Sequence, residues 1–162
     1  MKPALFHVLF IITCMFLLFS CARENHGPTN YPSTYSYTTE TGTYTGGLAY
    51  CAYTSDSMAY DAQFYPNPQR LNYLVIDFSG AAYLPQATYN LGYDSLTHVR
   101  LKMQFIADDS HPFTATTGSM TITSFDTLNQ LLAGTFHFTG SYLSSARHIS
   151  NGSFTNLNYV KH

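Results

Sequence analysis

The side chains that most often do chemistry in enzymes are sparse in this chain and lack the spacings that catalysis uses. No Gly-x-Ser-x-Gly motif marks a nucleophilic serine, and no Gly-x-x-x-x-Gly-Lys motif forms a phosphate-binding loop. Zinc ligands usually come in close pairs, and the histidines of this chain are scattered. The candidates considered are His98, His111, His137 and His148. The sequence therefore predicts that the protein is not an enzyme and holds no metal or cofactor.

Acidic and thiol groups offer three weaker alternatives. Asp56 and Asp61 could flank a sugar as a carboxylate pair, although their spacing alone does not indicate it. The acidic loop at residues 108–110 could supply oxygens to calcium, but a solvated loop explains it better because no calcium-loop pattern surrounds it. Cys51 lies among Ala and Tyr in a strand-like segment, which indicates a buried and unreactive thiol.

Tyrosine is the residue type that could form a binding surface, since its ring is apolar and its tip is polar. The chain contains 14 Tyr and no Trp. One interpretation is a platform for a sugar or peptide, with Tyr44, Tyr50, Tyr53 and Tyr60 as its candidate members. The alternative is ordinary cross-strand pairing of aromatic rings on a sheet.

Three short segments share an Asp, then Ser or Thr, then Met or Leu. They begin at Asp56, Asp94 and Asp126, and their hydroxyl residues are Ser57, Ser95 and Thr127. This pattern resembles the O-glycan acceptor motif of exported Bacteroidota proteins, and all three lie in expected turns, where a bulky sugar fits. The alternative is that Asp-Ser and Asp-Thr are common turn dipeptides.

Composition limits the elements that position these residues. Of the 162 residues, 45% are hydrophobic and only 10% are charged, with a formal net charge of −2. A nucleic-acid partner is not expected, because phosphate binding needs clustered Lys and Arg. A chain rich in Tyr, Thr and Phe and poor in Glu and Lys favours strands over exposed helices.

The N-terminus has the layout of a secretory signal, with Lys2 followed by an apolar run over residues 4–19. The segment Leu18-Phe19-Ser20-Cys21 resembles a bacterial lipobox, which implies cleavage before Cys21 and a lipid on its sulfur. An uncleaved membrane anchor is the alternative, but the run is short for a span of about 20 residues. We expect a signal peptide over residues 1–20, a flexible tether over 21–41 and a folded domain over 42–162.

Strict alternation of apolar and polar residues predicts strands in most of that domain. The clearest segments are 73–78, 99–105, 119–123, 132–139 and 149–159, and weaker ones are 43–53, 58–64 and 87–91. About eight short strands separated by turns indicate an all-β fold, an antiparallel β-sandwich or flattened barrel. Close joins between the last three strands predict a C-terminal meander.

The C-terminal third carries a family pattern. It reads Gly118-Ser119-Met120-Thr121-Ile122-Thr123, then Gly134-Thr135-Phe136-His137-Phe138, then Asn151-Gly152-Ser153-Phe154. It resembles a family of uncharacterised Bacteroidota lipoproteins, a domain of unknown function. The resemblance implies location and fold and brings no catalytic residues: its glycines suit tight turns or close packing, and its phenylalanines suit a core.

Together these observations predict a monomeric, lipid-anchored protein of the outer membrane that binds a glycan, a peptide or another envelope protein without catalysis. The alternative is a structural or accessory envelope subunit with no small-molecule ligand. Residues 22–25, Ala-Arg-Glu-Asn, lack the acid-rich run expected of Bacteroidota surface-export signals. The periplasmic side is therefore favoured over the cell surface.

Overall fold

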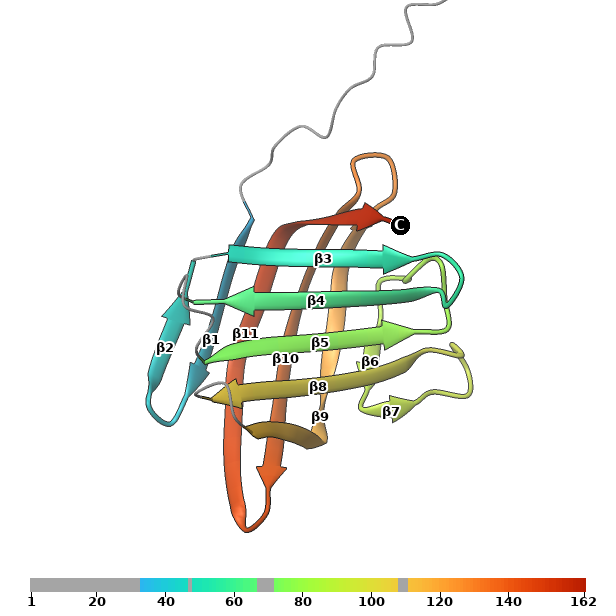
Figure 1. Ribbon diagram of the computed structural model, residues 1–162. Coiled ribbons are helices and arrows are strands. Elements are labelled where there is room, and N and C mark those ends of the chain that lie inside the picture. The colour runs from blue at the N-terminus through green and yellow to red at the C-terminus, as the bar shows by residue number, and fades with distance from the viewer. Residues whose placement is uncertain (1–32, 47, 67–71, 108–110) are drawn as a thin grey trace, which may run out of the picture.

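The computed structural model describes residues 33–46, 48–66, 72–107 and 111–162, and these form strands and turns without a helix (Figure 1). The candidate lipidation site Cys21, the signal segment and most of the expected tether lie outside the described residues. The strands are β1 (Thr34–Thr39), β2 (Gly42–Thr45), β3 (Leu48–Thr54), β4 (Ala59–Tyr65), β5 (Tyr73–Ser79), β6 (Thr88–Asn90), β7 (Gly92–Tyr93), β8 (Arg100–Ala107), β9 (His111–Asp126), β10 (Leu131–Tyr142) and β11 (Ser145–Lys161).

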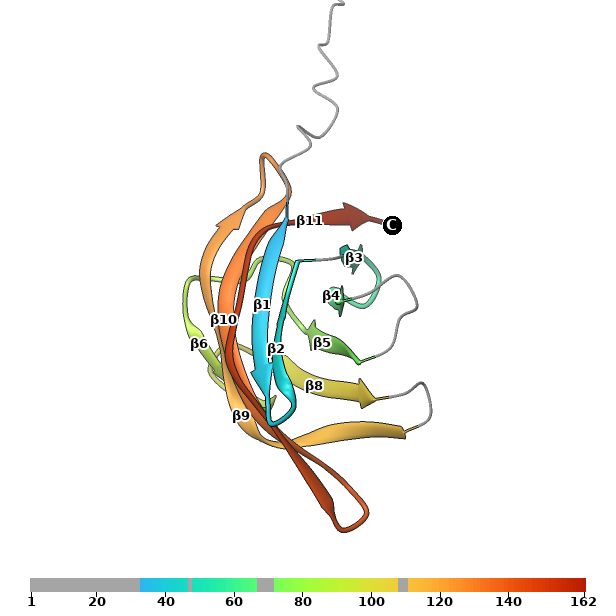
Figure 2. The ribbon, with the colours of Figure 1, turned by 90° about the vertical axis from the view of Figure 1, so that its left-hand side faces the viewer.

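The strands form one sheet in the order β10-β9-β8-β5-β4-β3-β11-β1-β2, and β10 also pairs with β11. That pairing closes a ring of seven strands, a flattened barrel. All pairings are antiparallel except the short parallel contact between β11 and β3. In Figure 2, β3, β4, β5 and β8 form one layer and β1, β11, β10, β9 and β6 form the other. The predicted all-β fold and the β9-β10-β11 meander are confirmed.

Two strands bend to join the layers. The start of β9 pairs with β8, and its later part pairs with β6 and β10. Similarly, β11 pairs with β1 near its middle and with β3 at its end. Register shifts occur in the pairings of β11 with β10 and β1, and such bulges increase local bend and twist. Strands β9 and β11 therefore belong to both layers and close the ring between them.

The folded region differs from the expectation at its N-terminal end. The tether was expected to run to residue 41, but Thr34–Thr39 forms strand β1, which pairs with β11 and β2. This part of the prediction is wrong because β1 is rich in Thr, Ser and Tyr, a composition shared by linkers and exposed strands. The weak candidate strand at 43–53 is in fact two strands, β2 and β3, which separate after Gly46 at its positive φ of 70°.

The core between the layers is largely aromatic. Phe64 packs near Phe136 and Phe154, with ring centroids 6.0 and 5.7 Å apart. Buried tyrosines direct their hydroxyls to backbone carbonyls: Tyr37 donates to Asn72 at 2.6 Å, and Tyr60 donates to Ala82 at 2.7 Å. These bonds allow tyrosine to act as a core residue, because a buried hydroxyl without a partner is costly.

Two glycines make room for these rings. Gly134 lies opposite Phe154, and Gly152 lies opposite Phe136, in neighbouring positions of the β10-β11 ladder. A Cβ on Gly152 would lie 2.4 Å from the Phe136 ring, and one on Gly134 would lie 2.8 Å from the Phe154 ring. The glycines thus serve close packing, one of the two roles that the sequence suggests, and neither lies in a tight turn.

Candidate functional site

The four candidate tyrosines do not form a shared surface. Tyr53 and Tyr60 are buried, with 8% and 1% of their area exposed, and their rings lie 4.5 Å apart inside the core. The prediction that both belong to a binding surface is therefore wrong. Tyr44 is half-buried and stacks on Tyr37 at 5.2 Å. Tyr50 is well exposed, at 42%, and lies on the outer face of β3.

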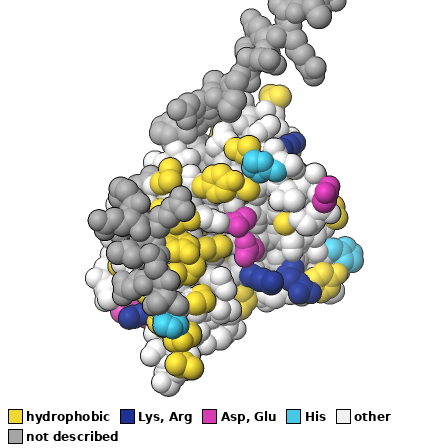
Figure 3. Space-filling model, in the orientation of Figure 1, with side chains coloured by type: hydrophobic (Ala, Val, Ile, Leu, Met, Phe, Trp, Pro, Cys, Tyr) yellow, Lys and Arg dark blue, Asp and Glu magenta, His cyan; other side chains and the backbone are white. Residues whose placement is uncertain are grey.

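The outer face of β3, β4, β5 and β8 brings charged residues together. Asp61 of β4 lies directly opposite Asp77 of β5, and Asp77 lies opposite Lys102 of β8. In the next row, Ser79 lies opposite Arg100. We call this surface, defined by these five residues with Thr54 and Ala59, the carboxylate face. Figure 3 shows acidic side chains side by side with basic ones in the middle of this side of the molecule.

A pocket of about 310 Å³ lies on the carboxylate face. Small side chains, Ala59 and Ser79, leave space between the larger ones around them. The two carboxylates stand along β4 and β5, and the two cations stand along the neighbouring strand β8. The pocket is therefore bordered by both signs of charge, about one strand spacing, 4.7–4.9 Å, apart.

A chain of hydrogen bonds along β4 positions one of the carboxylates. The Tyr65 hydroxyl donates to Gln63 Oε1, and Gln63 Nε2 donates to Asp61 Oδ1 at 2.9 Å. These residues occur at every second position and therefore share one side of the strand, where Asp61 and Gln63 are half-buried and Tyr65 is buried, with 8% of its area exposed. Asp61 is thereby held in place toward the pocket.

The second carboxylate has a different environment. Among the described residues, no hydrogen bond or ion pair joins the half-buried Asp77. Burial raises the pKa of Asp77 and the charge of Asp61 raises it further, while Lys102 acts in the opposite direction. Like charges directly opposite each other on a sheet are destabilising. The Asp77 carboxylate can thus accept a hydrogen bond from a ligand or form an ion pair with a positively charged group of the ligand.

Apolar side chains continue the same surface toward the start of β3. Tyr50 lies opposite Gln63, which lies opposite Val75. One row further, Tyr65 stacks on Tyr73 at 4.9 Å beside the exposed Leu48. Figure 3 shows hydrophobic side chains next to acidic ones on this side of the molecule. A ligand on this face therefore meets charge at one end and apolar surface at the other.

A second hollow, of about 400 Å³, lies on the outer face of the opposite layer. It occupies the middle of a row of hydroxyl side chains that crosses six strands in register. His137 and Asn151 border it. The row consists of Thr88, Thr121, Thr135, Ser153, Ser36 and Thr45. Cross-strand hydroxyl bonds, such as Thr88 to Thr121 at 2.8 Å, satisfy part of it, as on many solvent-facing sheets.

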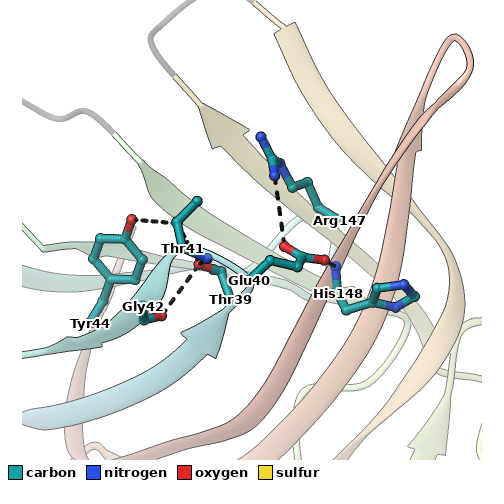
Figure 4. A network of polar contacts seen from close by, with 7 residues as sticks. All are labelled: Thr39, Glu40, Thr41, Gly42, Tyr44, Arg147 and His148. Carbon is teal, nitrogen blue, oxygen red and sulfur yellow. Dashed lines mark hydrogen bonds and ion pairs between the residues drawn. The ribbon is translucent and has the colours of Figure 1, made fainter.

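A third polar cluster joins the β1-β2 turn to β11 (Figure 4). The Glu40 carboxylate accepts a hydrogen bond from the backbone of His148 at 2.6 Å and lies 3.9 Å from the Arg147 guanidinium. Desolvation acts to raise the pKa of Glu40, but these bonds and the Arg147 charge lower it overall. The Thr41 hydroxyl bonds to Tyr44 and Thr39 within the same turn. These contacts join the β1-β2 turn to β11, so the cluster stabilises the turn.

The Asp-Ser and Asp-Thr segments all lie in turns with exposed hydroxyl residues, as predicted for Ser57, Ser95 and Thr127. Asp94 accepts hydrogen bonds from the Leu96 backbone and the Thr97 hydroxyl, both at 2.9 Å. These hydrogen bonds lower the pKa of Asp94, as those from the Asn129 backbone and side chain do for Asp126. The structure thus gives these two aspartates a turn-forming role. Glycosylation of the neighbouring hydroxyls stays a prediction.

The remaining candidates from the sequence are the thiol of Cys51 and a metal site. Cys51 is fully buried, and burial, followed by the charge of Asp61, raises its thiol pKa, which keeps it unreactive. Within the described ranges, no group of three His, Cys, Asp or Glu side chains could hold a metal ion. The same ranges contain no helix that is long and apolar enough to span a membrane. The acidic loop at 108–110 lies outside the described residues.

Comparison with known proteins finds no matching family model, no similar curated protein and no similar solved structure. The resemblance to Bacteroidota lipoproteins therefore stays a prediction. Sequence reasoning considered Asp61 with Asp56, whereas the structure pairs Asp61 with Asp77 and puts Asp56 in the β3-β4 turn. The available signal was that Asp61 and Asp77 each occupy the polar face of an alternating strand.

Proposed function

We propose that this chain is a lipid-anchored, non-catalytic binding protein of the cell envelope that binds a peptide on the carboxylate face. The observation that carries the proposal is the direct opposition of Asp61 and Asp77, with Asp77 lacking a partner among the described residues. Two like charges held in register weaken a sheet, and a ligand that donates to them removes that cost.

A peptide suits this face better than a glycan. Peptides carry ammonium, guanidinium and carboxylate groups that complement Asp61, Asp77 and Lys102, and apolar side chains that complement Tyr50 and Val75. Glycan sites rely on exposed aromatic rings, and two of the four candidate tyrosines are buried. The lipid anchor at Cys21 and a position on the periplasmic side of the outer membrane belong to the same proposal and rest on the N-terminal sequence.

The test is a comparison of peptide and glycan arrays probed with the full chain. We expect selected peptides to bind, and the Asp61→Asn/Asp77→Asn double variant to lose that binding. Asp56→Asn serves as the matched control, because this aspartate lies in an exposed turn. Binding to glycans alone would overturn the choice of peptide. Binding to neither array would support a structural subunit instead.

A further inference from the structure

We propose that the pocket on the carboxylate face binds the head group of an α-amino acid, with the ammonium group at Asp61 and Asp77 and the carboxylate at Arg100 and Lys102. This inference rests on the proposed binding role of the carboxylate face and adds a second, smaller ligand: a free amino acid in the pocket, beside the peptide proposed for the face as a whole. It depends on the pocket and on both pairs of charges together; two aspartates alone do not define a site.

The order of charges across the strands supports this assignment. The row that contains Asp61 and Asp77 continues to Lys102, so both carboxylates precede the cation in one line across β4, β5 and β8. Arg100 adds a second cation two residues before Lys102 on the same edge of the pocket. Along this line, the hydrogen-bond acceptors on β4 and β5 are followed by the donors on β8, at a distance of about one strand spacing.

An α-amino acid fits that spacing because its ammonium and carboxylate groups are bonded to the same carbon. The ammonium has three donors, enough to bond both carboxylates, and Arg100 presents a fork that matches a carboxylate. A ligand with only a positive charge would use only the two aspartates, and one with only a negative charge would use only the exposed Arg100 and Lys102, so a zwitterion makes the most contacts.

The size and surroundings of the pocket agree with a small ligand. Its volume of about 310 Å³ is at the lower end of small-molecule sites. Thr54 and Ser79 contribute hydroxyl groups to the lining of the pocket, and the small side chain of Ala59 leaves space within it. Asp61 is already fixed by Gln63, so binding requires little ordering of that side chain.

The two carboxylates face each other unfavourably in the ligand-free chain. Asp77 has neither a hydrogen bond nor an ion pair among the described residues, and it faces a like charge. The cations reduce this repulsion without contact, since the charge of Lys102 acts on Asp77. An ammonium group between the carboxylates would replace repulsion by two charge-assisted bonds.

The test uses saturation-transfer NMR of the full chain in detergent micelles, with L-alanine, L-leucine, L-phenylalanine and L-lysine as probes. At least one is expected to bind, and its N-acetyl and amide forms, which lack the ammonium or the carboxylate charge, are expected not to bind. Asp61→Asn, Asp77→Asn and Lys102→Gln should each weaken the affinity at least about tenfold, the usual effect of removing a charged hydrogen-bond partner. Asp56→Asn should leave it unchanged.

Two results would overturn the inference. One is the absence of binding by all four probes up to about 10 mM, a concentration at which a site with a Kd of about 1 mM is mostly occupied. The other is equal binding of an amino acid and its N-acetyl form. If peptides still bind in a manner that depends on Asp61 and Asp77, the zwitterion assignment fails and the proposed function stands. If neither peptides nor amino acids respond to these variants, both fail.

Discussion

Asp61 and Asp77 lie directly opposite each other across the β4-β5 pair, on the face that points away from the core. Gln63 binds the first of these carboxylates, while no group among the described residues binds the second. This opposition of like charges lowers the stability of the folded chain, and it places two carboxylate hydrogen-bond acceptors side by side. It therefore links the stability of the sheet to the binding that we propose.

Replacing Asp77 by Asn should increase stability at neutral pH while weakening binding. The folded-state pKa of Asp77 is raised, chiefly by burial, so the carboxyl binds its proton more tightly in the folded than in the unfolded chain. Stability therefore falls as the pH rises from the unfolded pKa of about 3.9 through the raised folded value. The neutral Asn avoids this loss.

Urea unfolding at pH 7 and at pH 3 measures this effect. We expect Asp77→Asn to gain up to about 1 kcal/mol at pH 7, the upper range for a cross-strand charge pair, and to gain less at pH 3. Asp56→Asn is the control and should change little at either pH. A gain that is equal at both pH values would contradict the proposed repulsion between the two carboxylates.

Replacing Gly152 by Ala should destabilise the fold. The new Cβ would lie 2.4 Å from the Phe136 ring and 2.6 Å from the Phe136 carbonyl oxygen, and the latter belongs to the backbone. Overpacking of this kind typically costs about 1–3 kcal/mol. The neighbouring Ser153→Ala is the control, because Ser153 lies beside the outer hollow. Denaturation midpoints measure both, and equal midpoints for the two variants would refute the packing argument.

Two Tyr-to-Phe substitutions should differ in their effect on the free energy of unfolding. Tyr60→Phe removes the hydrogen bond from the hydroxyl to the Ala82 carbonyl and should cost about 1 kcal/mol. Tyr35→Phe removes a buried hydroxyl that has no hydrogen-bond partner among the described residues, and it should be neutral or stabilising. Thermal unfolding of the two variants provides the measurement. A larger loss for Tyr35→Phe than for Tyr60→Phe would show that the hydroxyl environments are reversed.

The N-terminal sequence makes a prediction about maturation. Expression in a bacterium that processes lipoproteins should give a chain that begins at Cys21 and carries a lipid, and Cys21→Ser should abolish both. Intact mass measures cleavage and lipid together. Membrane fractionation then gives the localisation, and an unmodified full-length mass for the parent chain would exclude this processing.

The three exposed turns make a separate prediction in the native host. Ser57, Ser95 and Thr127 are accessible, so attached sugars should add mass beyond the lipid. The triple variant with Ala at all three positions should lose that mass. If the mass of the native protein equals polypeptide plus lipid, the turns have only the structural role seen for Asp94 and Asp126.

The sequence by itself determined most of the strand segments after β1, because alternation and turn residues are local properties. In β8, Leu101, Met103 and Phe105 are buried while Arg100 and Lys102 are exposed, as the period of two predicts. It also determined that the last three strands form a meander, since their connections are short. The turn conformation of the Asp-containing segments followed from local patterns in the same way.

Only the tertiary structure decided which residues meet. Cross-strand register depends on the whole sheet, so the sequence did not reveal that Asp61 faces Asp77 or that Gly152 lies beneath Phe136. The burial of Tyr53 and Tyr60 could not be predicted from the sequence either. Tyrosine occurs both on solvent-exposed sheet faces and in cores, and only the tertiary structure shows which environment each ring has. Strand β1 has the composition of a linker, and its place in the fold depends on backbone pairing with β11 and on the core that buries Tyr35 and Tyr37.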